Sequence, residues 1–283
     1  MEAEKREIDV RGRKVALVEA GSGPPLVYLH GFADLHGVAG NLQPFHEGLA
    51  QNHRLIAPAH PGCNGSSDFL QGNRVEDFLF HYCEVFDALK LDRFVLVGHC
   101  VGGWLAAEYA VRHPERVTRL VLIGATGLFV AGEPIGDIFM NSNPDHGTSL
   151  ATLRHMLFAS RDAPQALRYY PDGRGDLEEE MRRYGMLRFG SAIGFRPPYL
   201  YNRSLVDRLY RASMPSVVVW GAEDHMVPVA HGSAYAKHLD HSTLQLIATD
   251  VRRSLLMRKA VRNPAQEPSW SSMPLASEMI PAP

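Results

Sequence analysis

Short apolar runs alternate with helical patterns along the first half of the chain. Runs rich in Val, Ile and Leu occupy residues 14–19, 25–29, 54–57, 94–97 and 119–123. Uninterrupted apolar runs of this length are typical of strands buried on both faces, as in a parallel sheet. Between the runs, residues 75–89 and 101–112 repeat apolar side chains at three- and four-residue steps, which predicts one apolar helical face. The alternation predicts an α/β fold with a mostly parallel central sheet and helices on both faces.

The middle of the chain has a different pattern. Residues 127–200 contain few strand signals, several Gly–Pro breaks and a charged helix candidate at 176–188, which together predict a helical cap insertion. Strand signals return at 216–220 and 243–247. We therefore expect a core formed by 1–126 and 201–262 and interrupted by the cap.

The last segment departs from both patterns. Residues 250–262 have the composition of a basic amphipathic helix, and residues 263–283 are rich in Pro and Ser without periodicity. The second stretch is expected to be a disordered tail.

Composition narrows the function classes. The 29 basic and 31 acidic residues give a net charge of −2, which argues against a nucleic-acid binder. Three cysteines cannot form a disulfide framework and favour a reducing compartment. There is no signal-peptide pattern at the start and no apolar run near the length of a membrane helix, so a cytoplasmic protein without a membrane partner is expected.

Neither zinc-ligand spacing nor GxGxxG after the first strand is present, so no metal or cofactor is expected. The expected partner is a small-molecule substrate, and the oligomeric state is open.

The sharpest chemical signal is a Gly-rich turn between a predicted strand and a predicted helix. Its sequence is Gly98-His99-Cys100-Val101-Gly102-Gly103. Gly98 and Gly102 would let a tight turn close around a nucleophile without a Cβ clash. The amino terminus of the helix would favour the thiolate of Cys100. The pattern predicts a nucleophilic Cys100; a buried structural cysteine in a strand–helix turn is the alternative.

Two further loops follow predicted strands and supply candidate catalytic groups. Acyl transfer requires N–H donors where the oxyanion develops. We expect these donors to be the backbone N–H groups of Val101 and of Phe32, in the loop after 25–29. After the strand at 216–220, Asp224 is the candidate acid that would orient a histidine base, with Glu223 as a solvated neighbour.

Five segments together resemble the α/β-hydrolase superfamily. They occur in the superfamily's order: the Phe32 loop, 56–67, the turn at Cys100, 113–125 and 220–228. The resemblance covers about residues 8–247, and the cap with the stretch 195–215 resembles the meta-cleavage-product-hydrolase and epoxide-hydrolase-like branch. It implies an α/β-hydrolase fold with a helical cap and a triad in the order nucleophile, acid, histidine.

Cysteine at the nucleophile position is the first departure from the superfamily's pattern, which usually has serine or aspartate there. It resembles the dienelactone-hydrolase variation; an engineered or incidental change from serine is the other explanation. The absence of aspartate disfavours chemistry through an alkyl-enzyme.

The missing base is the second departure. The superfamily places its histidine after the last strand, but no histidine follows 243–247. His30 and His60 are conceivable substitutes, whereas the remaining candidates are expected to face elsewhere: His99, His225, His231, His238 and His241. The catalytic histidine is therefore unassigned, and a shifted reading frame near 248–250 would explain the ending.

The sequence thus predicts a hydrolase that acts on a carbonyl substrate through Cys100. Ester, thioester and C–C bond cleavage all remain open. Turnover is expected to be impaired, because an acyl-enzyme needs an activated water for its breakdown. The alternative is a non-catalytic ligand-binding protein on the same scaffold, which the missing histidine favours.

Overall fold

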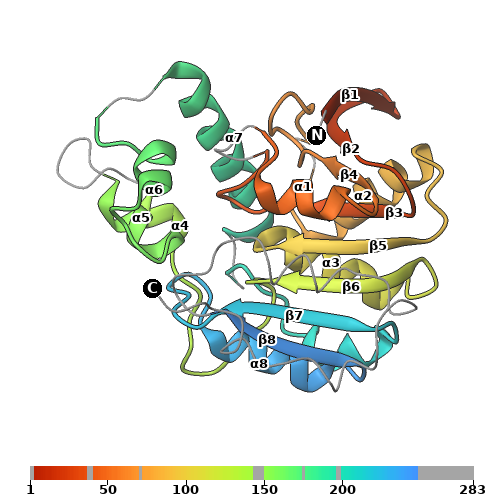
Figure 1. Cartoon of the computed structure of the whole chain (residues 1–283). Helices are drawn as coiled ribbons and strands as arrows, with labels where there is room; N and C mark the ends of the chain where they lie inside the picture. Colours follow the sequence, from red (N-terminus) through yellow and green to blue (C-terminus); the bar gives the residue numbers. More distant parts are fainter. Residues whose placement is uncertain are drawn as a thin grey trace.

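An eight-stranded sheet forms the centre of the molecule (Figure 1). The computed structural model describes residues 3–36, 41–69, 72–142, 150–173, 176–195 and 199–247. In these ranges the strand order is β1-β2-β4-β3-β5-β6-β7-β8. The strand bounds are β1 Ala3–Val10, β2 Arg13–Ala20, β3 Pro25–Leu29, β4 Arg54–Pro58, β5 Phe94–His99, β6 Val117–Ile123, β7 Ser216–Gly221 and β8 Ser242–Ile247. β1 and β2 pair antiparallel, β2 is antiparallel to β4, and the pairs from β4 to β8 are parallel. The predicted α/β class with a mostly parallel sheet is confirmed.

Alternate residues of the central strands belong to two separate apolar clusters. In β3, Val27 and Leu29 lie in one cluster, whereas Leu26 and Tyr28 lie in the other. All four side chains are at most 1% exposed. Because successive side chains point to opposite faces of a strand, a strand covered on both sides must be apolar at every position. This explains why the strands read as uninterrupted apolar runs.

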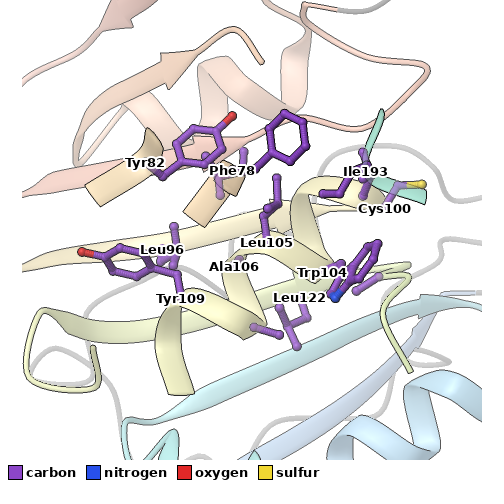
Figure 2. Close-up of a cluster of buried hydrophobic side chains, with 14 of the residues drawn as sticks. Phe78, Tyr82, Leu96, Cys100, Trp104, Leu105, Ala106, Tyr109, Leu122 and Ile193 are labelled. Atoms are coloured by element: carbon purple, nitrogen blue, oxygen red, sulfur yellow. The ribbon is translucent and has the colours of Figure 1, made fainter. Parts of the chain in front are cut away.

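Helices lie against both faces of the sheet. Buried residues of α1 (Pro44–Ala50) belong to the cluster of Leu26, whereas those of α2 (Val75–Ala88), α3 (Val101–Arg112) and α8 (Val229–His238) belong to the other. α3 packs on β5 and β6, and α8 packs on β7 and β8. Figure 2 shows Trp104 and Leu105 of α3 among the side chains of β5 and β6, with Cys100 in the same cluster. The interior packing of α3 therefore fixes the turn that contains Cys100.

The segment between β6 and β7 is mostly helical. It contains α4 (Ile138–Asn141), α5 (Ala151–Leu157), α6 (Pro164–Tyr169) and α7 (Leu177–Gly194), and η1 (Val206–Arg211) follows before β7. Figure 1 shows α4, α5 and α6 beside the edge toward which the parallel strands point. The helix expected at 176–188 corresponds to α7. The domain limits at 127–200 stay a prediction, and the expected helix at 250–262 and tail at 263–283 lie outside the described residues.

None of the helices that the structure describes is long and apolar enough to cross a membrane.

Candidate functional site

Cys100 stands in a sharp turn between β5 and α3. Its φ and ψ are 54° and −117°, a conformation that non-glycine residues rarely adopt and that is common at functional sites. Positions 98 and 102 require glycine because other backbone atoms lie very close to them. A Cβ on Gly98 would lie 2.7 Å from the Gly103 Cα, and one on Gly102 would lie 2.5 Å from the His30 carbonyl oxygen. Side chains at either position would force the strand, the turn and the loop after β3 apart.

Two backbone N–H groups act as donors that favour the thiolate form of Cys100. They belong to Val101, at the start of α3, and to Phe32, in the loop after β3. These are the two donors that the sequence predicts for an oxyanion hole. Cys100 itself is 6% exposed, and its Sγ lies 3.8 Å from the Sδ of Met226.

The pKa of the Cys100 thiol is nevertheless raised well above its usual range. Burial is the largest cause and the negative charge of Asp224 the next, and together they outweigh the hydrogen bonds from Val101 and Phe32. The Val101 N–H at the helix amino terminus does favour the thiolate, but it does not set the net direction of the pKa shift. Helix N–H groups do favour the anion, but desolvation of a buried sulfur has the larger effect.

Asp224 lies in the loop after β7 and is held by its own backbone. The N–H groups of Met226 and Val227 donate to its Oδ1 over 3.0 and 2.9 Å. No described residue makes a hydrogen bond to Oδ2, and the side chain borders the same cavity as Cys100. Asp224 is thus oriented with one carboxylate oxygen available, as an acid that positions a base would be.

The conceivable substitute bases, His30 and His60, have structural roles. The Nε2 of His30 accepts from the His60 N–H over 2.9 Å, and His60 Nε2 lies 2.8 Å from the His30 carbonyl oxygen. Burial lowers the pKa of His30 well below its usual range and that of His60 to about 3. Both rings are neutral at physiological pH and engaged with neighbouring groups.

The remaining candidate histidines lie apart from the nucleophile or are bound to other groups. The exposed ring of His225 stacks on His155 of α5 at a centroid distance of 4.5 Å. His231 Nε2 lies 2.8 Å from the Glu133 carbonyl oxygen, and His238 Nδ1 lies at the same distance from that of Ala234. Within the described ranges, no histidine makes a hydrogen bond to Cys100 or Asp224. The base unassigned from the sequence therefore stays unassigned.

Asp34 is a buried acid beside the candidate site that the sequence did not single out. Its Oδ2 accepts from the Tyr28 hydroxyl over 2.6 Å and from the Gly31 N–H over 2.9 Å, and it lies 2.8 Å from His99 Nδ1. Burial alone would raise the Asp34 pKa, but the hydrogen bond and charge of His99 hold it well below its usual range. The carboxylate thereby ties the loop of Phe32 to the residue before Cys100. The sequence signal for Asp34 was that it is the single acidic residue in the loop after β3.

A cavity of about 210 Å³ opens beside Cys100 at the carboxyl ends of the parallel strands. Much of its lining is apolar or aromatic, including Phe32 and Phe45 from the core and Met156 and Phe158 from the segment between β6 and β7. Three carboxylates, Asp34, Glu223 and Asp224, border it, and the described lining contains no Lys or Arg. No group of three or more metal-ligating side chains is found within the described parts of the chain.

Comparisons with known proteins agree with this architecture. A family model described as "alpha/beta hydrolase fold" matches residues 24–250. The 2-hydroxymuconate semialdehyde hydrolase of Pseudomonas sp. strain CF600 is 35% identical over 154 residues, 54% of this chain and 53% of that protein. The 2-hydroxy-6-oxo-2,4-heptadienoate hydrolase of Pseudomonas putida F1 is 37% identical over 119 residues, 41% of this chain and 43% of that protein. The matches thus span about half the length of these relatives.

A solved structure extends the likeness of fold over most of the chain. The meta-cleavage product hydrolase from Pseudomonas fluorescens IP01 superposes with a TM-score of 0.68 at 20% identity, covering 86% of this chain and 89% of that one. At this identity the likeness shows the fold alone. The sheet order, the turn at Cys100 and the family match over residues 24–250 together show that this chain belongs to the alpha/beta hydrolase fold family.

Proposed function

We propose that the chain is a hydrolase that cleaves a carbonyl compound through Cys100. The observation that carries the proposal is the position of Cys100 in a sharp strand-to-helix turn at the wall of a cavity, where the N–H groups of Val101 and Phe32 favour its thiolate. Donors that stabilise a thiolate there are placed to stabilise the oxyanion that forms when the sulfur attacks a carbonyl carbon. Asp224 borders the same cavity as the orienting acid.

The reaction divides into acylation and deacylation. In acylation, Cys100 Sγ adds to the carbonyl carbon, the oxygen becomes an oxyanion held by the two N–H groups, and its collapse expels the leaving group. A proton must leave the thiol and reach the leaving group, and a water must then hydrolyse the thioester. Both steps normally use a histidine, so we infer slow turnover or a single acylation event.

The bond that is cleaved is still open between ester, thioester and C–C. Two relatives are named as hydrolases of a semialdehyde and of an oxo acid, both of which contain a carbonyl group. Their names support a carbonyl substrate for this chain and add weight to C–C cleavage.

A non-catalytic ligand-binding protein is the second candidate. It is favoured by the raised pKa of the Cys100 thiol and by the lack of a histidine hydrogen bond to Asp224 among the described residues. Such a protein would use the cavity to bind a carbonyl compound without forming a bond to it.

Hydrolysis of a chromogenic short-chain ester distinguishes the two functions. An enzyme should release the chromophore at a rate that Cys100→Ala abolishes, and intact-mass measurement should show an acyl group on the parent protein. Cys83→Ala is the matched control, because Cys83 is a half-buried thiol on α2 outside the cavity lining. Stoichiometric ester binding without an adduct or release would refute the enzymatic proposal.

The missing base can be tested in the same assay. Imidazole in the buffer should increase chromophore release, since general-base catalysis contributes about 10²–10⁴-fold when the base is well placed. His225→Ala should leave the rate within a few-fold of the parent, because that ring stacks on His155 instead of approaching Asp224. A bell-shaped pH–rate profile that His225→Ala removes would instead identify His225 as the base.

A further inference from the structure

The ring of His99, the residue before Cys100, is held by a buried carboxylate. Its Nδ1 lies 2.8 Å from Oδ2 of Asp34, in the loop after β3. The Asp34 side chain is 6% exposed, whereas the His99 side chain is 34% exposed and borders the same cavity as Cys100. The sequence led us to expect that this ring faces elsewhere. The structure instead places it at the cavity, with one of its two nitrogens fixed.

The carboxylate determines which nitrogen of a neutral His99 ring carries the proton. Burial alone would raise the pKa of Asp34, but the hydrogen bond and charge of His99 hold it well below its usual range, so the carboxyl is ionised at physiological pH. An ionised carboxylate can only accept, and Nδ1–H must therefore donate to it, which leaves a lone pair on Nε2. A carboxylate imposes this same tautomer on the histidine base of a catalytic triad.

The second nitrogen of His99, Nε2, is available for chemistry. It makes no hydrogen bond to a described residue, and it is not cut off from solvent. Nδ1 of the same ring and the Cβ of Cys100 each lie 2.9 Å from the point that a Cβ on Gly31 would occupy. The ring therefore stands beside the side chain of the nucleophile and has a lone pair that water can reach.

We propose that His99, oriented by Asp34, is the general base that activates water for hydrolysis of the acyl-enzyme. The proposal rests on the proposed function, since it concerns the second step at that same site. No hydrogen bond joins His99 to the Cys100 sulfur in the described parts of the chain, so the ring acts on water and not on the thiol. Slow turnover, and not a single acylation event, is then the outcome at this site.

The step is a base-assisted hydrolysis of the thioester on Cys100. His99 Nε2 takes one proton from a water as the water oxygen bonds to the acyl carbon, and the N–H groups of Val101 and Phe32 stabilise the oxyanion. When the oxyanion collapses, the C–S bond breaks and its electron pair goes to the sulfur. The proton on Nε2 passes through solvent to the sulfur, so that an acid product, the thiol and a neutral ring remain.

The charges around His99 favour the protonated ring that this step creates. An imidazolium beside the ionised Asp34 is stabilised by the opposite charge at low dielectric. His46 of α1 also acts on the ring electrostatically, but burial lowers the pKa of His46 to about 4, so it is neutral during the reaction. The described cavity lining contains no Lys or Arg. Its other ionisable side chains, none of them a cation, are Tyr28, Cys100, Tyr169, Glu223 and Asp224.

Separate measurement of acylation and deacylation tests this role. The protein is acylated by the chromogenic ester, excess ester is removed, and loss of the acyl group is followed by intact mass. In His99→Asn the amide N–H lies near the former Nδ1 and still donates to Asp34, whereas the base at Nε2 is lost. Deacylation should slow by about 10²-fold or more, and acylation should slow far less. His238→Asn, at the end of α8 and outside the described cavity lining, is the matched control and should deacylate at the parental rate.

The pH dependence of deacylation is a readout that a purely structural role of His99 would not change. Deacylation of the parent protein should rise with pH and level off once the ring is neutral. Deacylation of His99→Asn should instead rise in proportion to the hydroxide concentration, as expected when no base assists the water. Thermal melts establish that the variant is folded across the pH range.

Equal slowing of acylation and deacylation in His99→Asn would overturn the proposal, because it would show that His99 only positions the oxyanion loop. Parental deacylation in this variant would overturn it as well, while leaving Cys100 as the nucleophile. A parent protein that neither forms an acyl group nor releases the chromophore would refute the proposed function and the base together. Nitrogen NMR of the His99 ring does not depend on acylation, and a neutral ring protonated on Nε2 instead of Nδ1 would contradict the tautomer that the role requires.

Discussion

Substitution of Gly102 by alanine tests how the turn at Cys100 is built. A Cβ at this position would lie 2.5 Å from the His30 carbonyl oxygen, 2.5 Å from the Leu29 carbonyl carbon and closer still to the Leu29 oxygen. These are backbone atoms at the end of β3, so relief requires movement of the strand end or of α3. Overpacking of a well-packed interior typically costs about 1–3 kcal/mol. For a protein of this size, that lowers the Tm by roughly 2–12 °C.

The same substitution should impair acylation more than stability. The displaced residues, Leu29 and His30, lead directly into the loop of Phe32, whose N–H favours the thiolate of Cys100. Movement of that loop removes one of two oxyanion donors, and loss of one donor costs about 10²–10³-fold in rate in well-studied acyl-transfer sites. We therefore expect acylation by the chromogenic ester to fall by at least tenfold in protein that is still folded at the assay temperature.

Gly221→Ala is the control for this experiment. A Cβ there makes only ordinary contacts, the nearest at 3.7 Å from the Asp224 Cβ, so its Tm should stay within about 2 °C of the parent. Denaturant melts and ester acylation rates are measured on both variants. A Gly102→Ala protein with parental Tm and parental acylation would refute the close packing of the turn on β3.

Three further predictions concern ionisation. Alkylation of Cys100 by iodoacetamide should keep rising with pH beyond 9, because burial raises the thiol pKa; a plateau near pH 7 in mass-spectrometric mapping would contradict this. Burial lowers the pKa of His36 and His60 to about 4 and 3. Their neutral forms stabilise the fold above the unfolded pKa of ~6.5, and this stability is lost as pH falls, by up to about 1.4 kcal/mol per pH unit for each ring. Urea melts at pH 7, 6 and 5 should show the decline, and a flat profile would be inconsistent with buried neutral rings. For Asp34, whose folded pKa is depressed, stability is present above ~4 and lost in more acidic solution. Asp34→Asn should therefore be less stable than the parent at pH 7 and show a smaller acid-induced loss below pH 4 in the same melts.

The buried strands were predictable because their environment is uniform. Residues 94–97 and 120–123 are apolar at consecutive positions, and the structure places them in β5 and β6 with apolar clusters on both faces. β1 gave no such signal. Its first three side chains are exposed and only its last, Val10, is buried. An edge strand with one partner, β2, that meets the core only at its end buries few side chains, so its sequence contains no continuous apolar run.

The short helix α1 was not predicted, because its sequence also carries little local signal. α1 has seven residues and contains His46 and Gly48, neither of which favours a helix. Its helical structure depends on packing against β4. Tertiary packing supplies most helical stability when the helix is too short to be stable alone.

The turn at Cys100 could also be predicted from local sequence, but the pKa of the Cys100 thiol could not. The glycines at 98 and 102 and the position between a strand and a helix predict the turn, since those requirements act over a few residues. The pKa of the thiol depends instead on burial and on Asp224, which is distant in sequence and brought near by the pairing of β6 with β7. A local rule about helix termini therefore describes the contribution of the Val101 N–H but not the net pKa shift.

Asp34 illustrates how one buried carboxylate can hold the loop of Phe32 beside Cys100. Its Oδ2 gathers hydrogen-bonding groups from β3, from the loop of Phe32 and from the residue before Cys100, so the carboxylate must be present and ionised for the loop to sit beside the nucleophile. Oδ1 is buried and has no hydrogen-bond partner among the described residues, so the carboxylate is held through Oδ2. A change at Asp34 should therefore alter the position of the oxyanion loop.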